Sequence, residues 1–117
     1  MITKERRLAE RFNLKIPLLV RILKAATPES RAESLNVSTR GICFATNLPL
    51  REGTPVQVMF EMPEEVAHRP ASEWRCAGHV VHLQPGCFRQ EEICAGVAFD
   101  CYEVLPVAET SVRRHRA

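Results

Sequence analysis

Two arginines near the start of the chain have a spacing that could support binding chemistry. Arg7 and Arg11 would share a face if this segment formed a helical turn, and would reach different parts of a larger ligand if it were extended. A guanidinium group donates paired hydrogen bonds to phosphate, bonds the O6 and N7 atoms of guanine, and stacks on aromatic bases. The pair therefore indicates anion or nucleotide binding, although clustered arginines are also typical of a solvated surface.

A second set of small polar residues, Asn36-x-Ser38-x-x-Gly41, ends a predicted strand. Asn36 and Ser38 are two residues apart, so on a strand they point to the same face, opposite Leu35 and Val37. Gly41 tolerates backbone conformations that let the chain come close to a ligand. The pattern predicts a ledge of small polar side chains at the end of the strand, followed by a tight turn of the chain. The alternative is an ordinary strand-ending turn in which Asn and Ser bond their own backbone.

The other residues that could do chemistry form weaker patterns. Cys76, His79 and His82 are metal-ligand types, but on a strand we expect Cys76 and His82 on one face and His79 on the other, so they cannot converge on a metal. The five cysteines form no close pair and have no basic setting to activate a thiol, which favours reduced core thiols. The glutamate pairs at 64–65 and 91–92 are typical of solvated loops. We expect no metal, no cofactor and no catalytic activity.

Length and charge suggest one domain with basic ends. Leu, Ile, Val and Phe occupy 31 of 117 positions, enough for a packed core. Residues 1–24 hold seven Lys or Arg against two Glu, residues 25–112 hold six against twelve acidic residues, and residues 113–117 add three Arg. The basic ends suit an anionic partner. The longest apolar stretch is too short to span a bilayer, and the first residues do not resemble a secretory signal, so we expect a cytoplasmic protein.

Apolar residues that alternate with polar ones predict strands. The clearest run is Val56, Val58, Phe60 and Met62, and a similar run begins at Ile16. We expect strands within 16–22, 35–38, 42–44, 56–62, 75–83 and 93–99, with the second and third separated by Gly41. We also expect a loop over 47–53, a helical turn at 64–67 and a short helix after Pro106. Six or so short strands separated by turn signals predict a small antiparallel barrel or sandwich.

Taken together, Arg7-x-x-x-Arg11 and Asn36-x-Ser38-x-x-Gly41 resemble the paired signature of the PilZ domain family, Arg-x-x-x-Arg and Asp/Asn-x-Ser-x-x-Gly. Residues 77–82 and 96–99 are similar to the late strands of that family, so the resemblance covers nearly the whole chain. It implies a mainly β fold, a six-stranded antiparallel barrel with a C-terminal tail over residues 13–117. A flexible basic switch segment over residues 1–12 would precede the barrel.

The resemblance also implies a non-catalytic receptor for the bacterial second messenger cyclic di-GMP. Arg7 and Arg11 would clamp phosphates and guanines, Asn36 and Ser38 would bond a guanine from the barrel surface, and Gly41 would allow close approach. Binding would order the switch segment and reshape a surface that a downstream protein partner reads.

Three positions refine this expectation. Arg6 lies just before the first motif. The family resemblance implies that a basic residue at this position goes with two ligand molecules per domain. Asn36 replaces the commoner Asp, which keeps an acceptor but loses a charge-assisted hydrogen bond of about 1 kcal/mol. His82 lies where the family often has an aromatic or basic residue, so it either stacks on a guanine or is a plain surface histidine.

Two other functions stay open. The chain could be a PilZ-like adaptor that acts through protein contacts without a ligand. Its basic ends also suit nucleic acid, but few aromatic residues interleave with the basic ones, so no stacking platform for bases is evident. We therefore expect no nucleic-acid partner. We also expect no insertion into a membrane, because no apolar stretch is long enough to span a bilayer.

Overall fold

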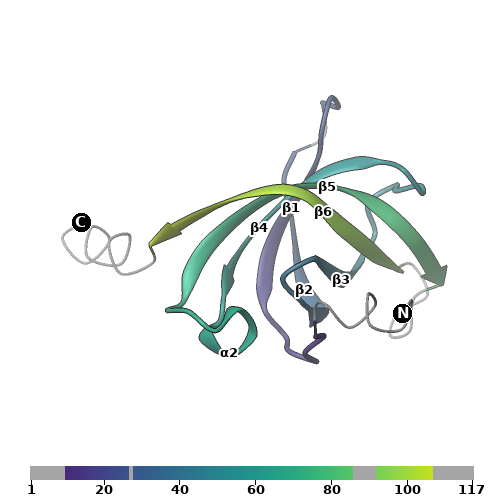
Figure 1. Cartoon of the computed structure of the whole chain (residues 1–117). Coiled ribbons are helices and arrows are strands. Elements are labelled where there is room, and N and C mark those ends of the chain that lie inside the picture. The colour runs from purple at the N-terminus through teal and green to yellow at the C-terminus, as the bar shows by residue number, and fades with distance from the viewer. Residues whose placement is uncertain (1–9, 27, 86–91, 107–117) are drawn as a thin grey trace, which may run out of the picture.

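Six antiparallel strands close into a barrel in the computed structural model, which describes residues 10–26, 28–85 and 92–106 (Figure 1). A short helix follows the fourth strand. The elements are β1 (Pro17–Ile22), β2 (Ser30–Val37), β3 (Gly41–Thr46), β4 (Pro55–Met62), α2 (Glu64–Ala67), β5 (Ser72–Pro85) and β6 (Ile93–Pro106). The order around the barrel is β1-β2-β3-β6-β5-β4, and β4 pairs with β1 to close it. The predicted six-stranded antiparallel barrel is confirmed.

The barrel interior is filled by the alternating apolar residues. Val56, Val58, Phe60 and Met62 of β4 are all buried, as the period-two run predicts. Burying an aliphatic or aromatic side chain of this size contributes about 1.5–3 kcal/mol, so this strand holds its register firmly. α2 forms at the predicted helical turn and buries Val66 in the same core.

One expected alternation is wrong in β2. Leu35 and Val37 do not share a face, because the pairing of β2 with β3 shifts between Ser34 and Asn36 and leaves Leu35 as an extra residue. Such a bulge sets two residues against one and reverses the side-chain alternation at that point. Ser34 and Val37 therefore point into the core, both fully buried, while Leu35 is only partly buried.

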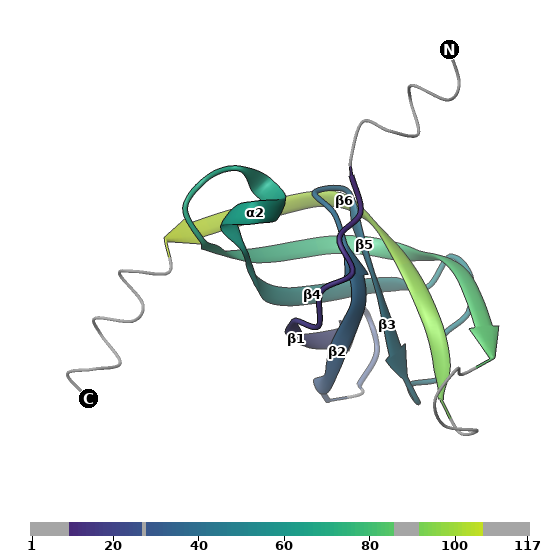
Figure 2. The same ribbon diagram turned by 90° about the horizontal axis from the view of Figure 1, so that it is seen from below.

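The buried Ser34 fastens the segment before β1 to the barrel. Its hydroxyl accepts a hydrogen bond from the Ile16 N–H at 2.8 Å and donates one to the Leu14 carbonyl. The Ser34 N–H also donates to the Ile16 carbonyl at 3.0 Å. Residues 10–16 consequently run along β2 before β1 begins (Figure 2).

β5 and β6 form a long twisted ribbon, and β6 extends beyond the expected end at Phe99. It runs to Pro106 because residues 101–106 pair with the first half of β5. Tyr102 stacks there on Trp74, with ring centroids 4.3 Å apart. The helix expected after Pro106 lies outside the described residues. Within the described part of the chain, no helix is both long and apolar enough for a membrane span.

Candidate ligand-binding site

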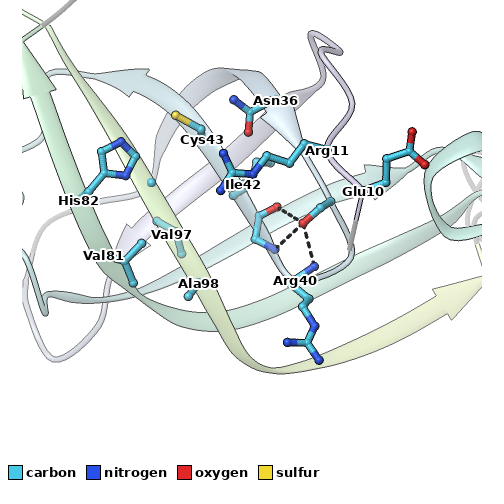
Figure 3. Close-up of a pocket in the computed structure, with 13 residues that line it drawn as sticks. Glu10, Arg11, Asn36, Arg40, Ile42, Cys43, Val81, His82, Val97 and Ala98 are labelled. Carbon is cyan, nitrogen blue, oxygen red and sulfur yellow. Dashed lines mark hydrogen bonds between the residues drawn. The ribbon is translucent and has the colours of Figure 1, made fainter. Parts of the chain in front are cut away.

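A hollow of about 850 Å³ lies on the outside of the barrel, over β2, β3, β5 and β6 (Figure 3). This volume falls within the range of about 300–1,000 Å³ that is typical of small-molecule sites. The residues around it come from four strands, the turn between β2 and β3, and the segment before β1. They are Glu10, Arg11, Asn36, Ser38, Arg40, Gly41, Ile42, Cys43, Val81, His82, Gly96, Val97 and Ala98.

The floor of the hollow is a row of directly opposed residues. Asn36 pairs with Cys43, Cys43 with Gly96, and Gly96 with His82, so the row crosses β2, β3, β6 and β5. Gly96 has no side chain, and the His82 ring occupies the space above it. A Cβ added at Gly96 would lie 2.5 Å from His82 Nδ1. The glycine therefore lets the imidazole lie over the sheet at one end of the row.

Backbone pairing brings Arg11 to the hollow. The next residue, Phe12, forms an isolated antiparallel bridge with Val37, which lies between the two polar motif residues Asn36 and Ser38. The Arg11 side chain is exposed and extends over the floor (Figure 3). The Glu10 carboxylate is directed away from the Arg11 guanidinium (Figure 3), which leaves that cation open to an anionic ligand.

Ser38 shapes the turn that ends β2. Its Oγ accepts hydrogen bonds from the N–H groups of Arg40 at 3.0 Å and Gly41 at 3.2 Å, and its own N–H donates to the Gly41 carbonyl at 2.9 Å. Only 7% of Ser38 is exposed. The strand-ending turn that the sequence offered as one interpretation of this motif is present, and the Ser38 hydroxyl forms part of it, while Ser38 also lines the hollow.

Gly41 is required by close packing at the same place. A Cβ at this position would lie 2.5 Å from the Val97 carbonyl oxygen of β6, closer than real contacts allow. Arg40, beside it, is exposed at the rim of the hollow, and its carbonyl accepts a hydrogen bond from the Phe99 N–H at 2.9 Å. The turn therefore joins β3 closely to β6 while it presents a second arginine.

The hollow gathers the predicted site residues that the structure describes. Arg11, Asn36, Ser38, Gly41 and His82 all line it, although up to 71 positions separate them in the sequence. The other two predicted residues, at positions 6 and 7, lie outside the described residues.

Sequence reasoning missed several lining residues. Arg40 occupies one of the unspecified positions of the second motif. Its guanidinium, which can bind an anion, was the feature of the sequence that could have identified it. Val81 lines the hollow because the pairing of β5 with β6 shifts between Val80 and His82. Nothing in the sequence alone marks that bulge.

The same bulge corrects the expected arrangement of Cys76, His79 and His82. Cys76 is fully buried, whereas both histidines lie on the outside, so Cys76 and His82 do not share a face. His79 Nδ1 instead lies 3.0 Å from an Asp100 carboxylate oxygen. No cluster of three or more metal-ligating side chains occurs among the residues described.

Cys76 does not have the environment of a reactive thiol. Burial, together with the neighbouring Cys101, raises the pKa of Cys76 to about 12. At neutral pH it therefore stays protonated and fills the core.

Comparison with known proteins identifies the family of the chain. The sequence model of the PilZ domain matches residues 5–104. The chain therefore belongs to the PilZ family, whose domains serve as receptors for cyclic di-GMP or as adaptors. No curated protein matches it.

A solved structure gives independent support for the fold. The chain is similar to the structure of the Bacillus subtilis inhibitor of motility, MotI/DgrA, with a TM-score of 0.65 and 16% sequence identity. The match covers 94% of this chain and 51% of that one, so the chain spans about half the length of its structural neighbour. At this level of identity the likeness shows the barrel fold.

Proposed function

We propose that this chain is a non-catalytic receptor for cyclic di-GMP that binds the dinucleotide in the hollow over β2, β3, β5 and β6. The supporting observation is that one hollow collects Arg11, Asn36, Ser38, Gly41 and His82. These residues come from three segments that are far apart in the sequence, and their chemistry matches a ligand with two phosphates and two guanines.

Each residue has a distinct part in this proposal. Arg11 bonds a phosphate or the O6 and N7 edge of a guanine, because its planar fork donates to either. Asn36 bonds a guanine edge from the floor, and His82 stacks on a base face. Ser38 and Gly41 hold the turn that lets the ligand approach the backbone closely. Arg6 and Arg7 add cations from the segment that leads into Arg11.

Signalling in this proposal depends on the segment before Phe12. A ligand shifts a conformational equilibrium only when it contacts one state better than the other. Contacts from Arg6, Arg7 and Arg11 favour a state in which residues 1–12 lie over the bound ligand. A partner protein then recognises the surface formed by that segment and the barrel.

Two intercalated ligand molecules per domain are part of the proposal. A third arginine adjacent to the motif, Arg6, supplies charge for a dimer that carries four phosphate charges. Isothermal titration calorimetry measures this directly. A stoichiometry near two supports the dimer. A value near one would contradict the dimer and the role of Arg6 in binding it.

Calorimetry also tests the receptor function itself. We expect the unmodified chain to bind cyclic di-GMP and Arg11→Ala to bind it about 10- to 150-fold more weakly, since a charge-assisted bond contributes about 1.5–3 kcal/mol. Arg21→Ala is the matched control, because Arg21 Nη2 bonds Gln57 Oε1 at 2.9 Å between β1 and β4 and does not line the hollow.

Other outcomes favour the alternatives. Equal affinity in all three chains would remove Arg11 from the site. Absence of ligand heat together with a stable complex with a purified protein partner would favour an adaptor. A gel shift with DNA or RNA that cyclic di-GMP does not compete away would favour nucleic-acid binding.

A further inference from the structure

The Asn36 side chain is a polar group on the floor of the hollow that the fold leaves available. Within the described part of the chain its amide makes no hydrogen bond, in contrast to the hydroxyl of Ser38, which the turn engages. The amide is partly exposed and lies beside Cys43 at one end of the floor (Figure 3). Its donors and acceptor are therefore free to bond a base.

An amide and a carboxylate select bases differently. The Asn36 amide offers one acceptor oxygen and two N–H donors. It matches the N1–H and O6 of guanine, and equally the N6–H and N7 of adenine, which is the usual Asn partner. A carboxylate only accepts, so it matches the adjacent N1–H and N2–H donors of guanine and faces an unpaired acceptor on adenine. An amide at position 36 therefore does not choose between the purines.

A cyclic dinucleotide has two bases. The base that does not bond Asn36 meets the arginines of the hollow, and these favour guanine. Arg11 and Arg40 only donate hydrogen bonds, and guanine presents two acceptors, O6 and N7, on one edge. The Glu10 carboxylate, which could accept from a base, is directed away from the Arg11 guanidinium (Figure 3). His82 can stack on either purine, since every base has a π-face.

We propose that Asn36 relaxes base selection, so that the hollow binds a mixed cyclic dinucleotide of one guanosine and one adenosine nearly as tightly as cyclic di-GMP. The inference rests on the proposed function, because it assigns a ligand range to the same hollow. The guanine of the mixed ligand bonds the arginines, and its adenine bonds Asn36. Cyclic di-AMP binds more weakly, because it offers the arginines no guanine.

The test compares three probes, cyclic di-GMP, the mixed guanosine–adenosine dinucleotide and cyclic di-AMP, by calorimetry on the full chain. In the unmodified protein we expect the first two dissociation constants to agree within about 5-fold. In Asn36→Asp the mixed ligand should become weaker relative to cyclic di-GMP by about 5- to 150-fold, the discrimination of one bidentate base contact. The added charge repels both dinucleotides alike, so it cancels in the ratio.

Two controls keep the outcomes separate. Asn47→Asp makes the same chemical change at an exposed position that does not line the hollow, and should leave the ratio unchanged. Thermal melting of each variant shows that it is folded, and the comparison of ligands on the unmodified chain needs no variant at all.

Each result decides the proposal. Tight binding of cyclic di-GMP with the mixed ligand more than about 5-fold weaker would overturn relaxed selection and leave the receptor function standing. An unchanged ratio in Asn36→Asp would remove Asn36 from base selection. If none of the three dinucleotides binds, the receptor function and this inference fail together.

Discussion

Phe12 and Val37 exchange both of their backbone hydrogen bonds, with N···O distances of 2.9 and 3.0 Å. This pair forms an isolated bridge outside the named strands, and the Phe12 side chain packs against the barrel core. Because Val37 stands between Asn36 and Ser38, the bridge holds Arg11 beside the second motif. A two-residue contact in the backbone thus connects two motifs that are about 25 positions apart in the sequence.

The geometry of the Arg11 guanidinium should matter beyond its charge. We expect Arg11→Lys to bind cyclic di-GMP more tightly than Arg11→Ala but more weakly than the unmodified chain, because an ammonium keeps the charge and loses the planar fork. Titrations at two salt concentrations separate the effects, since screening weakens the charge term that Lys retains. Full affinity in Arg11→Lys would mean that Arg11 acts as a point charge.

Ser38 should support both stability and binding. Ser38→Ala leaves the N–H groups of Arg40 and Gly41 without their acceptor, so we expect a loss of about 1–2 kcal/mol in the free energy of unfolding and weaker ligand binding. Chemical denaturation and calorimetry measure the two effects.

Ser72→Ala is the control for that loss. Its Oγ accepts a hydrogen bond from Trp74 Nε1 at 3.2 Å, and it does not line the hollow. It should reduce stability and leave affinity unchanged. If Ser38→Ala reduces stability alone, the turn has no influence on the ligand.

The strands and part of the site could be predicted from the sequence because their signals are local. The alternation from Val56 to Met62 requires one buried face, and the structure has it. The spacing of Asn36 and Ser38 places both at the same hollow despite the bulge at Leu35, since the bulge precedes both residues.

The site residues that could not be predicted reach the hollow through pairing between strands that are distant in the sequence. Val81 enters the hollow through a register shift between β5 and β6, and Gly96 contributes because it stands opposite both Cys43 and His82. Register shifts of this kind arise from the fit of whole strands to a closed barrel, so no local pattern encodes them. The burial of Ser34 could not be predicted for the same reason. A serine is expected on the surface, and the two residues that it bonds in the core lie 18 and 20 positions away.

Cys76 should make the stability of the barrel fall at alkaline pH. Its pKa is raised from 9.0 to about 12, so the folded state retains the proton after the unfolded state has lost it. The stabilising contribution is complete below pH 9 and is lost as the pH rises from about 9 to 12. Between pH 8 and pH 10 the unmodified chain should lose about 1.4 kcal/mol more than Cys76→Ala. Urea unfolding at the two pH values measures the difference, and parallel losses in both chains would contradict it.

Gly96 and Gly41 should respond differently to the same substitution. At Gly96 a new Cβ meets the His82 ring, a side chain on the barrel surface that can rotate away. At Gly41 it meets the Val97 carbonyl, which is held in the pairing of β3 with β6. We therefore expect Gly96→Ala to weaken cyclic di-GMP binding with a small change in stability, and Gly41→Ala to destabilise the fold by about 1–3 kcal/mol, as overpacking does.

The double variant Gly96→Ala/His82→Ala identifies the cause of the Gly96 effect. If Gly96→Ala acts by displacing the imidazole, it should weaken binding in the unmodified chain and have little further effect once His82 is already Ala. Calorimetry on the four chains of this cycle measures the coupling. Additive losses would show that the two residues act on the ligand independently. The position of the His82 ring over Gly96 would then have no part in binding.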